Sequence, residues 1–389
     1  MSLADSRKTQ AIAEWELLVE CVSAAPRTPK LEDWAKTIAW ENLLGLAEDH
    51  GVLGQVATQL GGLGDSIVPR EAKRRLTELH RGQLFSALRM SGELFRLAER
   101  FAAANIGMLT VKGPALAVAA YGDPGMRSYG DIDLLVRPSD IYRATEIMIA
   151  DGFDAAIPLE AIRAGKIPGQ YLFSQRDSKL LVELHNDRTL RYFPRPLRLD
   201  ELFQRQTSVR IDGREVPTLS VEDTLVLISV HGAKHFWDRL MWIADVGALV
   251  SRQSGMDWER VNQAAREVGA ERMVNTGLCL ATTVLGTNLP AAVLALASKD
   301  RIAKRLAEQA VRWLRACGDN SPRLVERAFF RMRMRGEGLL AGAGYLLKLS
   351  LSPTEEDWEV ATQGRKNRLL EAAARPFRLA RKYGKSGKN

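Results

Sequence analysis

The sequence contains little cysteine. Its 389 residues include three cysteines, Cys21, Cys279 and Cys317, which lie far apart and are odd in number. This usage excludes a disulfide framework and a cysteine-rich zinc site, and it is typical of proteins kept in a reducing compartment.

Long apolar runs are absent as well. No stretch approaches the roughly 18–20 residues that a helix needs to cross a bilayer. The first residues, MSLADSRKTQ, contain no apolar segment of the kind that directs export. We therefore expect a cytoplasmic protein and exclude an integral membrane protein.

Acidic residues are fewer than Lys and Arg, but the excess of positive charge is confined to the C-terminal end of the sequence. The formal net charge is +8, and residues 361–389 contain nine Lys or Arg and one acid, Glu371, so this tail alone contributes nine minus one, or eight. The rest of the chain is formally neutral and offers no extended basic track for nucleic acid. The tail could contact RNA or an anionic membrane surface; a solubilising end is the simpler interpretation.

The spacing of apolar residues divides the chain into regions. Residues 1–104 and those after 219 follow helical spacing, whereas short strands and helices alternate between them. We predict an α+β protein with a small mixed-sheet core and helical domains on either side, a division that its length also favours. The predicted parts are a helical N-terminal domain (1–104), the α/β core (105–219), a helical C-terminal domain (220–360) and the basic tail (361–389).

The expected elements of the core are short. Strands are predicted over 108–111 and 132–136, helices over 114–121 and 139–151, and hairpins over 171–185 and 208–219. Ser220 and Asp223 form a capping arrangement ahead of a helix that is predicted to run over 225–250.

Two carboxylates open the strand DIDLLV. Asp131 and Asp133 flank Ile132, and because residues i and i+2 of a strand share a face, both carboxylates point the same way. Close carboxylates in a partly desolvated site repel and raise each other's pKa, a cost that a bound cation removes. Mg²⁺ fits best, since it is a hard cation that takes oxygen ligands.

A third carboxylate comes from KLLVELHND, residues 179–187. Glu183 lies in the middle of a predicted strand and shares a face with His185; Asp187 is the alternative, although it falls in the following loop. If this strand lies beside the DIDLLV strand, three carboxylates converge. They could hold two divalent ions about 3.5–4 Å apart, as in phosphoryl and nucleotidyl transfer.

The turn Lys112-Gly113-Pro114 is predicted to bind phosphate. A helix that starts at Pro114 directs free N–H groups and its positive end toward a ligand. Gly113 lets the backbone come close, and Lys112 adds a full positive charge. Arg127 could clamp another phosphate oxygen in bidentate fashion.

The predicted helix over 225–250 carries a polar and aromatic stripe. Its members recur at helical spacing: His231, His235, Asp238, Trp242 and Asp245. The histidine pair could bind zinc, but the glutamate of the H-E-x-x-H motif is absent because Gly232 follows His231. Lys234 and His235 could reach nucleotide phosphates across a cleft; the alternative is a stripe satisfied by structural hydrogen bonds.

Together these segments resemble the uncharacterised bacterial nucleotidyltransferase family of the NTP_transf_5 type, in the DNA polymerase beta-like nucleotidyltransferase superfamily. The segments that carry the resemblance are VKGPAL, YGDPGMRSYGDIDLLV, LVELH and SVEDTLVLISVHGAKHFWDRLMWIADV. The resemblance covers residues 80–250 well and the helical flanks loosely. It implies a minimal nucleotidyltransferase core with Mg²⁺ on Asp131, Asp133 and Glu183. The superfamily usually has Gly-Ser or Gly-Gly where this chain has Lys112-Gly113. Family members often accompany surface-polysaccharide or peptide natural-product genes.

From these features we expect a nucleotidyltransferase that moves an NMP from an NTP, with ATP as the expected substrate, to a hydroxyl acceptor and releases pyrophosphate. The acceptor could be a small molecule, a peptide or a protein. Two alternatives remain: a kinase-like phosphotransferase that attacks the γ-phosphorus, which the unusual Lys112 suggests, and a non-catalytic binding protein on the same scaffold.

Overall fold

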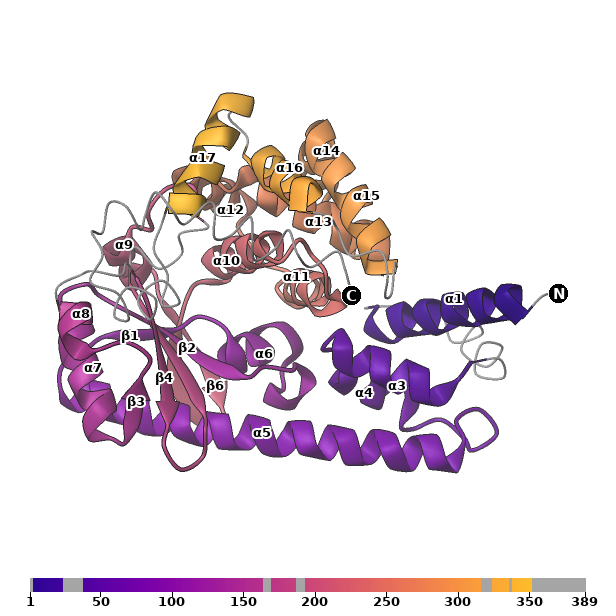
Figure 1. Ribbon diagram of the computed structural model, residues 1–389, viewed down its shortest axis with the longest axis horizontal. Coiled ribbons are helices and arrows are strands. Elements are labelled where there is room, and N and C mark those ends of the chain that lie inside the picture. Colours follow the sequence, from indigo (N-terminus) through magenta and orange to yellow (C-terminus); the bar gives the residue numbers. More distant parts are fainter. Residues whose placement is uncertain are drawn as a thin grey trace.

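The computed structural model describes residues 3–23, 38–163, 169–186, 193–315, 324–335 and 338–351. Within them the chain forms a seven-stranded mixed sheet and sixteen α-helices, with helical segments before and after the sheet (Figure 1). The predicted α+β fold class is confirmed. Among these residues, no helix has the length and hydrophobicity that crossing a bilayer requires. The basic tail and Asp187 lie outside the described residues.

The sheet has the strand order β3-β4-β5-β2-β1-β7-β6. Its strands are β1 (Met108–Thr110), β2 (Asp131–Val136), β3 (Phe153–Ala155), β4 (Gln170–Gln175), β5 (Leu181–His185), β6 (Thr207–Ile211) and β7 (Arg214–Thr218). Strand β2 runs parallel to β5 and antiparallel to β1, so the strand that begins with the two aspartates lies inside the sheet.

The helices form three groups along the chain. Before the sheet come α1 (Leu3–Val22), α3 (Trp40–Asp49), α4 (Leu53–Leu60) and α5 (Arg70–Ala103). Between strands lie α6 (Gly113–Tyr121), the 3₁₀ turn η1 (Pro124–Met126), α7 (Ile141–Ala150), α8 (Leu159–Arg163) and α9 (Leu199–Gln204). After the sheet come α10 (Val221–Lys234), α11 (Leu240–Arg252), α12 (Trp258–Val268), α13 (Glu271–Leu285), α14 (Ala291–Lys299), α15 (Arg301–Arg315), α16 (Leu324–Met334) and α17 (Leu339–Leu351).

The two faces of the sheet pack against different helices. Ile132, Leu134 and Val136 of β2 belong to a hydrophobic cluster that includes side chains of α5 and α7. Leu135 belongs to a second cluster, which includes Leu227 of α10 and other residues of the C-terminal helices. Because side chains alternate along a strand, the aspartates of β2 share the face of Leu135 and point toward α10.

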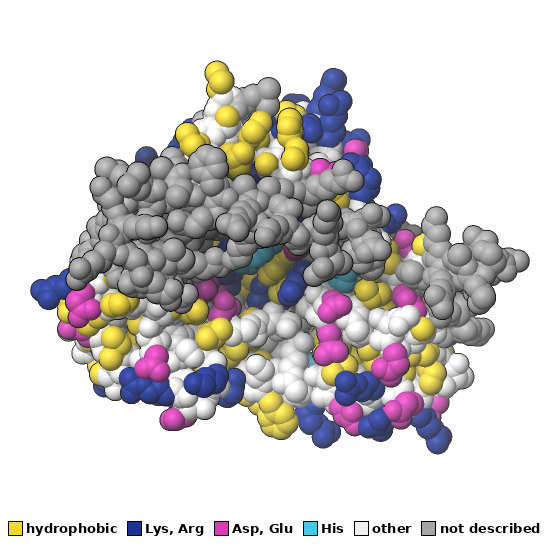
Figure 2. Space-filling model, in the orientation of Figure 1, with side chains coloured by type: hydrophobic (Ala, Val, Ile, Leu, Met, Phe, Trp, Pro, Cys, Tyr) yellow, Lys and Arg dark blue, Asp and Glu magenta, His cyan; other side chains and the backbone are white. Residues whose placement is uncertain are grey.

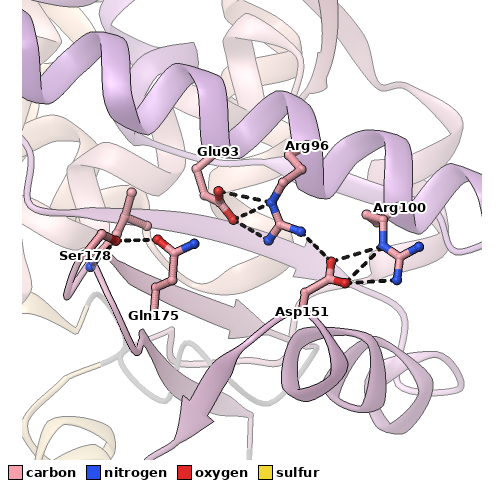
Figure 3. A network of polar contacts seen from close by, with 7 residues as sticks. Glu93, Arg96, Arg100, Asp151, Gln175 and Ser178 are labelled. Carbon is pink, nitrogen blue, oxygen red and sulfur yellow. Dashed lines mark hydrogen bonds and ion pairs between the residues drawn. The ribbon is translucent and has the colours of Figure 1, made fainter.

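Helix α5 packs on the opposite face of the sheet and extends past it beneath α4 (Figure 1). It is fixed to the end of α7 through Asp151, which accepts from Arg96 Nη1 at 2.7 Å and from Arg100 Nη2 at 2.9 Å (Figure 3). Burial opposes ionisation of Asp151, but the two guanidinium groups outweigh it and lower the pKa of the carboxyl. Glu93 accepts from Arg96 in the same network, and Ser178 donates to Gln175 at the β4–β5 turn.

The predicted continuous helix over 225–250 is wrong. The chain forms two helices, α10 and α11, and between them Phe236 and Trp237 have left-handed backbone angles, with φ of 58° and 56°. The cause is the burial of Trp237, whose ring packs so closely on α10 and α13 that a Cβ at Gly232 or Gly277 would lie 2.5 or 2.8 Å from it. The predicted cap is confirmed, because Ser220 Oγ accepts from the backbone N–H of Asp223 at 3.2 Å.

Candidate active site

Neighbouring parallel strands bring two of the predicted acids side by side. Asp133 of β2 pairs in register with Glu183 of β5, and Asp131 pairs with Leu181. Paired residues of parallel strands point to the same face of a sheet, so the Asp133 and Glu183 carboxylates meet on the α10 side. Ligand atoms of Asp133, Glu183 and His185 all lie within 4.8 Å of one another.

Two basic side chains contact this pair. Lys112 Nζ lies 2.8 Å from Oδ1 of Asp133, and His185 Nε2 lies 2.8 Å from the same oxygen and 3.3 Å from Oε2 of Glu183. The side chain of Asp133 is 1% exposed, so these contacts offset charges that water does not reach. Nδ1 of His185 is buried without a hydrogen-bond partner among the described residues.

His185 was assigned no role from the sequence. Its position two residues after Glu183, on the same face of one predicted strand, was the available signal. The contact with Asp133 needs the neighbouring strand and could not be inferred from that spacing. The structure therefore adds His185 to the predicted set.

The electrostatics of the carboxylates differ. Burial, followed by the charge of Asp133, raises the pKa of Asp131 to about 6, although Lys112 acts against it. Burial also opposes ionisation of Asp133, but Lys112 and His185 outweigh it and lower the pKa of that carboxyl. Glu183 is likewise held ionised, because its contact with His185 outweighs its burial and lowers its pKa. At neutral pH the site therefore holds ionised carboxylates.

A cleft of about 530 Å³ opens onto the carboxylates. Asp131, Asp133, Glu183 and Lys112 line it from the sheet side, and the end of α10, the turn after it and the start of α11 line it from the helical side. Figure 2 shows a hollow near the centre of the molecule in which Lys or Arg and His side chains are visible. The cleft thus joins acids and bases from the predicted core and the predicted C-terminal domain.

The turn Lys112-Gly113-Pro114 leads into α6, which begins at Gly113, one residue before the predicted start, and its residues differ in access to the cleft. Lys112 precedes α6 and reaches the cleft. Gly113 is buried and has a φ of +54°, and a Cβ there would lie 3.4 Å from the carbonyl oxygen of Asp131. Glycine is therefore required by the backbone conformation. A contact between Gly113 and phosphate stays a prediction.

Arg127 lines the cleft, but it is bound to another carboxylate. Its Nε donates to Oδ2 and Oδ1 of Asp245 in α11, at 2.9 and 3.0 Å, and the two side chains are 4% and 2% exposed. The hydroxyl of Tyr121 donates to the same carboxylate at 3.0 Å. Asp245, which was predicted as part of the polar stripe, instead binds Arg127 and holds it in place. The contact of Arg127 with phosphate stays a prediction.

Lys234 and His235 also line the cleft. His231, His235 and Trp242 lie together as a cluster of rings on the same side. Among the described residues, neither histidine belongs to a group of three metal-ligand side chains. The contacts of Lys234 and His235 with nucleotide stay predictions.

The donor set fits a hard divalent cation. Asp133 and Glu183 supply adjacent carboxylate oxygens that are held ionised in a buried position, and Asp131 lies on the same face at the entrance of the strand. Carboxylate oxygens are the ligands that Mg²⁺ takes in proteins, usually one or two of them together with substrate phosphates. His185 adds a nitrogen beside them.

Comparisons with known proteins identify the family of the chain. A family model described as "Uncharacterised nucleotidyltransferase" matches residues 36–286, which include the whole sheet and both carboxylate strands. The crystal structure of an antigenic nucleotidyltransferase-like protein from Paracoccidioides brasiliensis is similar over 53% of this chain and 96% of that chain, at 15% identity and a TM-score of 0.32. No curated protein is similar enough to this chain to count as a match.

Proposed function

Because the chain belongs to the uncharacterised nucleotidyltransferase family, we propose that it is a Mg²⁺-dependent enzyme that transfers an NMP from an NTP to a hydroxyl group and releases pyrophosphate. ATP is the expected nucleotide, and the acceptor is a small molecule, a peptide or a protein. The observation that carries this proposal is the in-register pair of Asp133 and Glu183, which opens onto a cleft beside Lys112.

Asp131, Asp133 and Glu183 would hold the metal, and two ions fit the number of carboxylates. When bound, the metal neutralises phosphate charge and favours ionisation of the attacking hydroxyl. The chain supplies the rest of the catalysis through positioning and fixed charges.

Lys112 has a distinct task in this scheme. Its ammonium lies at the junction of the carboxylates and the cleft, and its side chain is 13% exposed. Burial would lower its pKa, but Asp133 and Asp131 outweigh that effect and raise it, so Lys112 is a permanent cation. A flexible four-carbon stem lets the ammonium contact a phosphate oxygen of the substrate while it stays close to Asp133.

The charge balance of the cleft supports a role for bound metal. Four carboxylates and four Lys or Arg side chains line it, so its formal charge is zero. A nucleotide triphosphate alone would make this partly buried space strongly negative, which is costly at low dielectric. Divalent cations beside the carboxylates would remove that cost.

The test measures products with the full-length protein, Mg²⁺, each of the four NTPs labelled at the α-phosphorus, and a metabolite extract as the source of acceptor hydroxyls. We expect pyrophosphate release with transfer of label to an acceptor. Asp131→Asn and Asp133→Asn should each lower the rate by about 100-fold or more, because each removes a carboxylate ligand of the metal that would neutralise the phosphate charge.

Asp212→Asn is the matched control, since Asp212 lies exposed in the β6–β7 turn, where its positive φ also suits asparagine. Thermal unfolding of each variant checks that it folds. Undiminished turnover in both Asp131→Asn and Asp133→Asn would rule the proposal out. Release of ADP with no pyrophosphate would instead support the kinase-like alternative.

A further inference from the structure

Three aromatic rings lie together on the helical side of the cleft. His231 is in the last turn of α10, His235 follows that helix, and Trp242 is in the first turn of α11. The rings of His235 and Trp242 are stacked, with centroids 5.3 Å apart and planes 21° apart. His231 meets Trp242 edge-on at 4.6 Å. All three side chains line the cleft that contains the carboxylates.

A hydrogen bond holds the side chain of Trp242 in place, and its ring still faces the cleft. Its Nε1 donates to Oδ1 of Asp238 at 3.3 Å. Both His235 and Trp242 are half-buried, so part of their ring surface is open to the cleft. Trp237 differs, because its side chain is fully buried in the hydrophobic core. The two tryptophans thus have different surroundings, and Trp242 is the one available to a ligand.

The turn between α10 and α11 creates this stack. In a continuous helix, His235 and Trp242 would be seven residues and about 10 Å apart along the axis, too far for their rings to stack. The left-handed conformations of Phe236 and Trp237 bring them face to face. Such conformations are uncommon for bulky residues, and residues held in them cluster at functional sites.

The stacked pair is an uncharged surface among charged ones. Burial, followed by the charges of Lys234 and Lys112, lowers the pKa of His235 to about 4, so its imidazole is neutral at physiological pH. A flat uncharged surface beside cations suits a ligand that has both a planar ring and phosphates. Aromatic side chains bind nucleobases through such ring faces.

We propose that His235 and Trp242, here called the aromatic wall, bind the base of the nucleotide by stacking while the phosphates face Lys112 and the carboxylates. This inference rests on the proposed function, because it takes the substrate to be an NTP. The cleft volume of about 530 Å³ lies within the roughly 300–1,000 Å³ typical of ligand pockets. Since stacking uses ring faces, the wall accepts any base and favours purines, which have the larger ring surface.

The experiment compares ligands with and without a base. The full-length protein is titrated calorimetrically in Mg²⁺ with ATP, GTP, CTP and UTP, and with inorganic tripolyphosphate, which has the phosphates alone. Trp242→Leu removes the ring and Trp242→Phe keeps one. Trp258→Leu, at the start of α12 and outside the cleft, is the matched control.

Trp242→Leu should lower the affinity for ATP and GTP by roughly 10- to 100-fold, the range for loss of one base–aromatic stack. It should leave the affinity for tripolyphosphate unchanged, and Trp242→Phe should restore most of the nucleotide affinity. Unchanged nucleotide affinity in Trp242→Leu, or an equal loss for nucleotides and tripolyphosphate, would overturn the aromatic wall alone. Wild-type protein that binds no nucleotide would overturn the proposed function together with it.

Discussion

The ion pair of Arg127 and Asp245 shows how single residues hold the site in place. Arg127 lies four residues before Asp131, and Asp245 belongs to α11, so the pair ties the loop ahead of β2 to the helical side of the cleft. Burial raises the pKa of Asp245, and Arg127 acts against that rise. Removing either Arg127 or Asp245 should destabilise the fold, because the remaining buried charge would carry its full desolvation cost without a partner.

Arg127→Met should therefore lower the free energy of unfolding by about 3–5 kcal/mol, the usual cost of leaving one partner of a buried pair unpaired. The double variant Arg127→Met/Asp245→Leu should lose much less than the sum of the two single variants, because both charges are gone. Urea unfolding of the four proteins measures the coupling. Strictly additive losses would show that the two side chains do not depend on each other.

The sequence predicted that the acids lie near one another, but it did not predict their contacts with other side chains. Asp131, Asp133 and Glu183 were identified from side-chain alternation, which is a local property of each strand. His185 contacts Asp133, which is 52 residues away in the sequence, and Arg127 contacts Asp245, which is 118 residues away. Such contacts depend on strand order and helix packing, which cannot be inferred from the spacing of residues along the sequence. Arg127 was therefore predicted as a free phosphate clamp.

At the scale of elements, the sequence predicted six of the seven described strands, missed β3, and did not predict the break in the long C-terminal helix. The predicted strands are apolar segments bounded by turn signals, so local pattern and tertiary packing agree, whereas β3 has three residues and pairs with β4. The region 225–250 also has an unbroken helical pattern. Its break at Phe236 and Trp237 comes from the burial of Trp237 under α10 and α13, a tertiary effect that overrides local preference.

Gly232→Ala tests whether Trp237 is as tightly packed as the structure shows. The added methyl would lie 2.5–2.7 Å from three atoms of the Trp237 ring, so the ring must move. Overpacking costs about 1–3 kcal/mol, and the better helix propensity of alanine returns up to about 1 kcal/mol. With three close contacts we expect a net loss of about 1–2 kcal/mol in the free energy of unfolding, measured in urea.

Gly92→Ala in α5 is the control for propensity alone. Gly92 is exposed in a helix interior, and an added Cβ there would meet no atom within 4 Å. This variant should gain up to about 1 kcal/mol. A Gly232→Ala protein as stable as Gly92→Ala would contradict the close packing of Trp237 that shapes the α10–α11 turn.

At the scale of the whole molecule, the cleft lies where the regions predicted from the sequence meet. One hydrophobic cluster includes residues from all three regions, among them Leu43 of α3, Leu135 of β2 and Leu227 of α10. Asp131, Asp133 and Glu183 come from the sheet, Trp242 and Asp245 belong to α11, and His235 lies between α10 and α11. The site therefore depends on how the sheet and these helices pack, and the boundaries at 104 and 219 stay predictions.

The central claim is that Asp133 and Glu183 together bind divalent metal with a nucleotide whose phosphates face Lys112. A crystal structure of the full-length protein with Mg²⁺ and an ATP analogue that cannot be cleaved between the α- and β-phosphates tests it most directly. We predict metal density in contact with both carboxylates, with the triphosphate in the cleft beside Lys112. Nucleotide bound elsewhere, or a cleft with nucleotide and no metal at either carboxylate, would contradict the account.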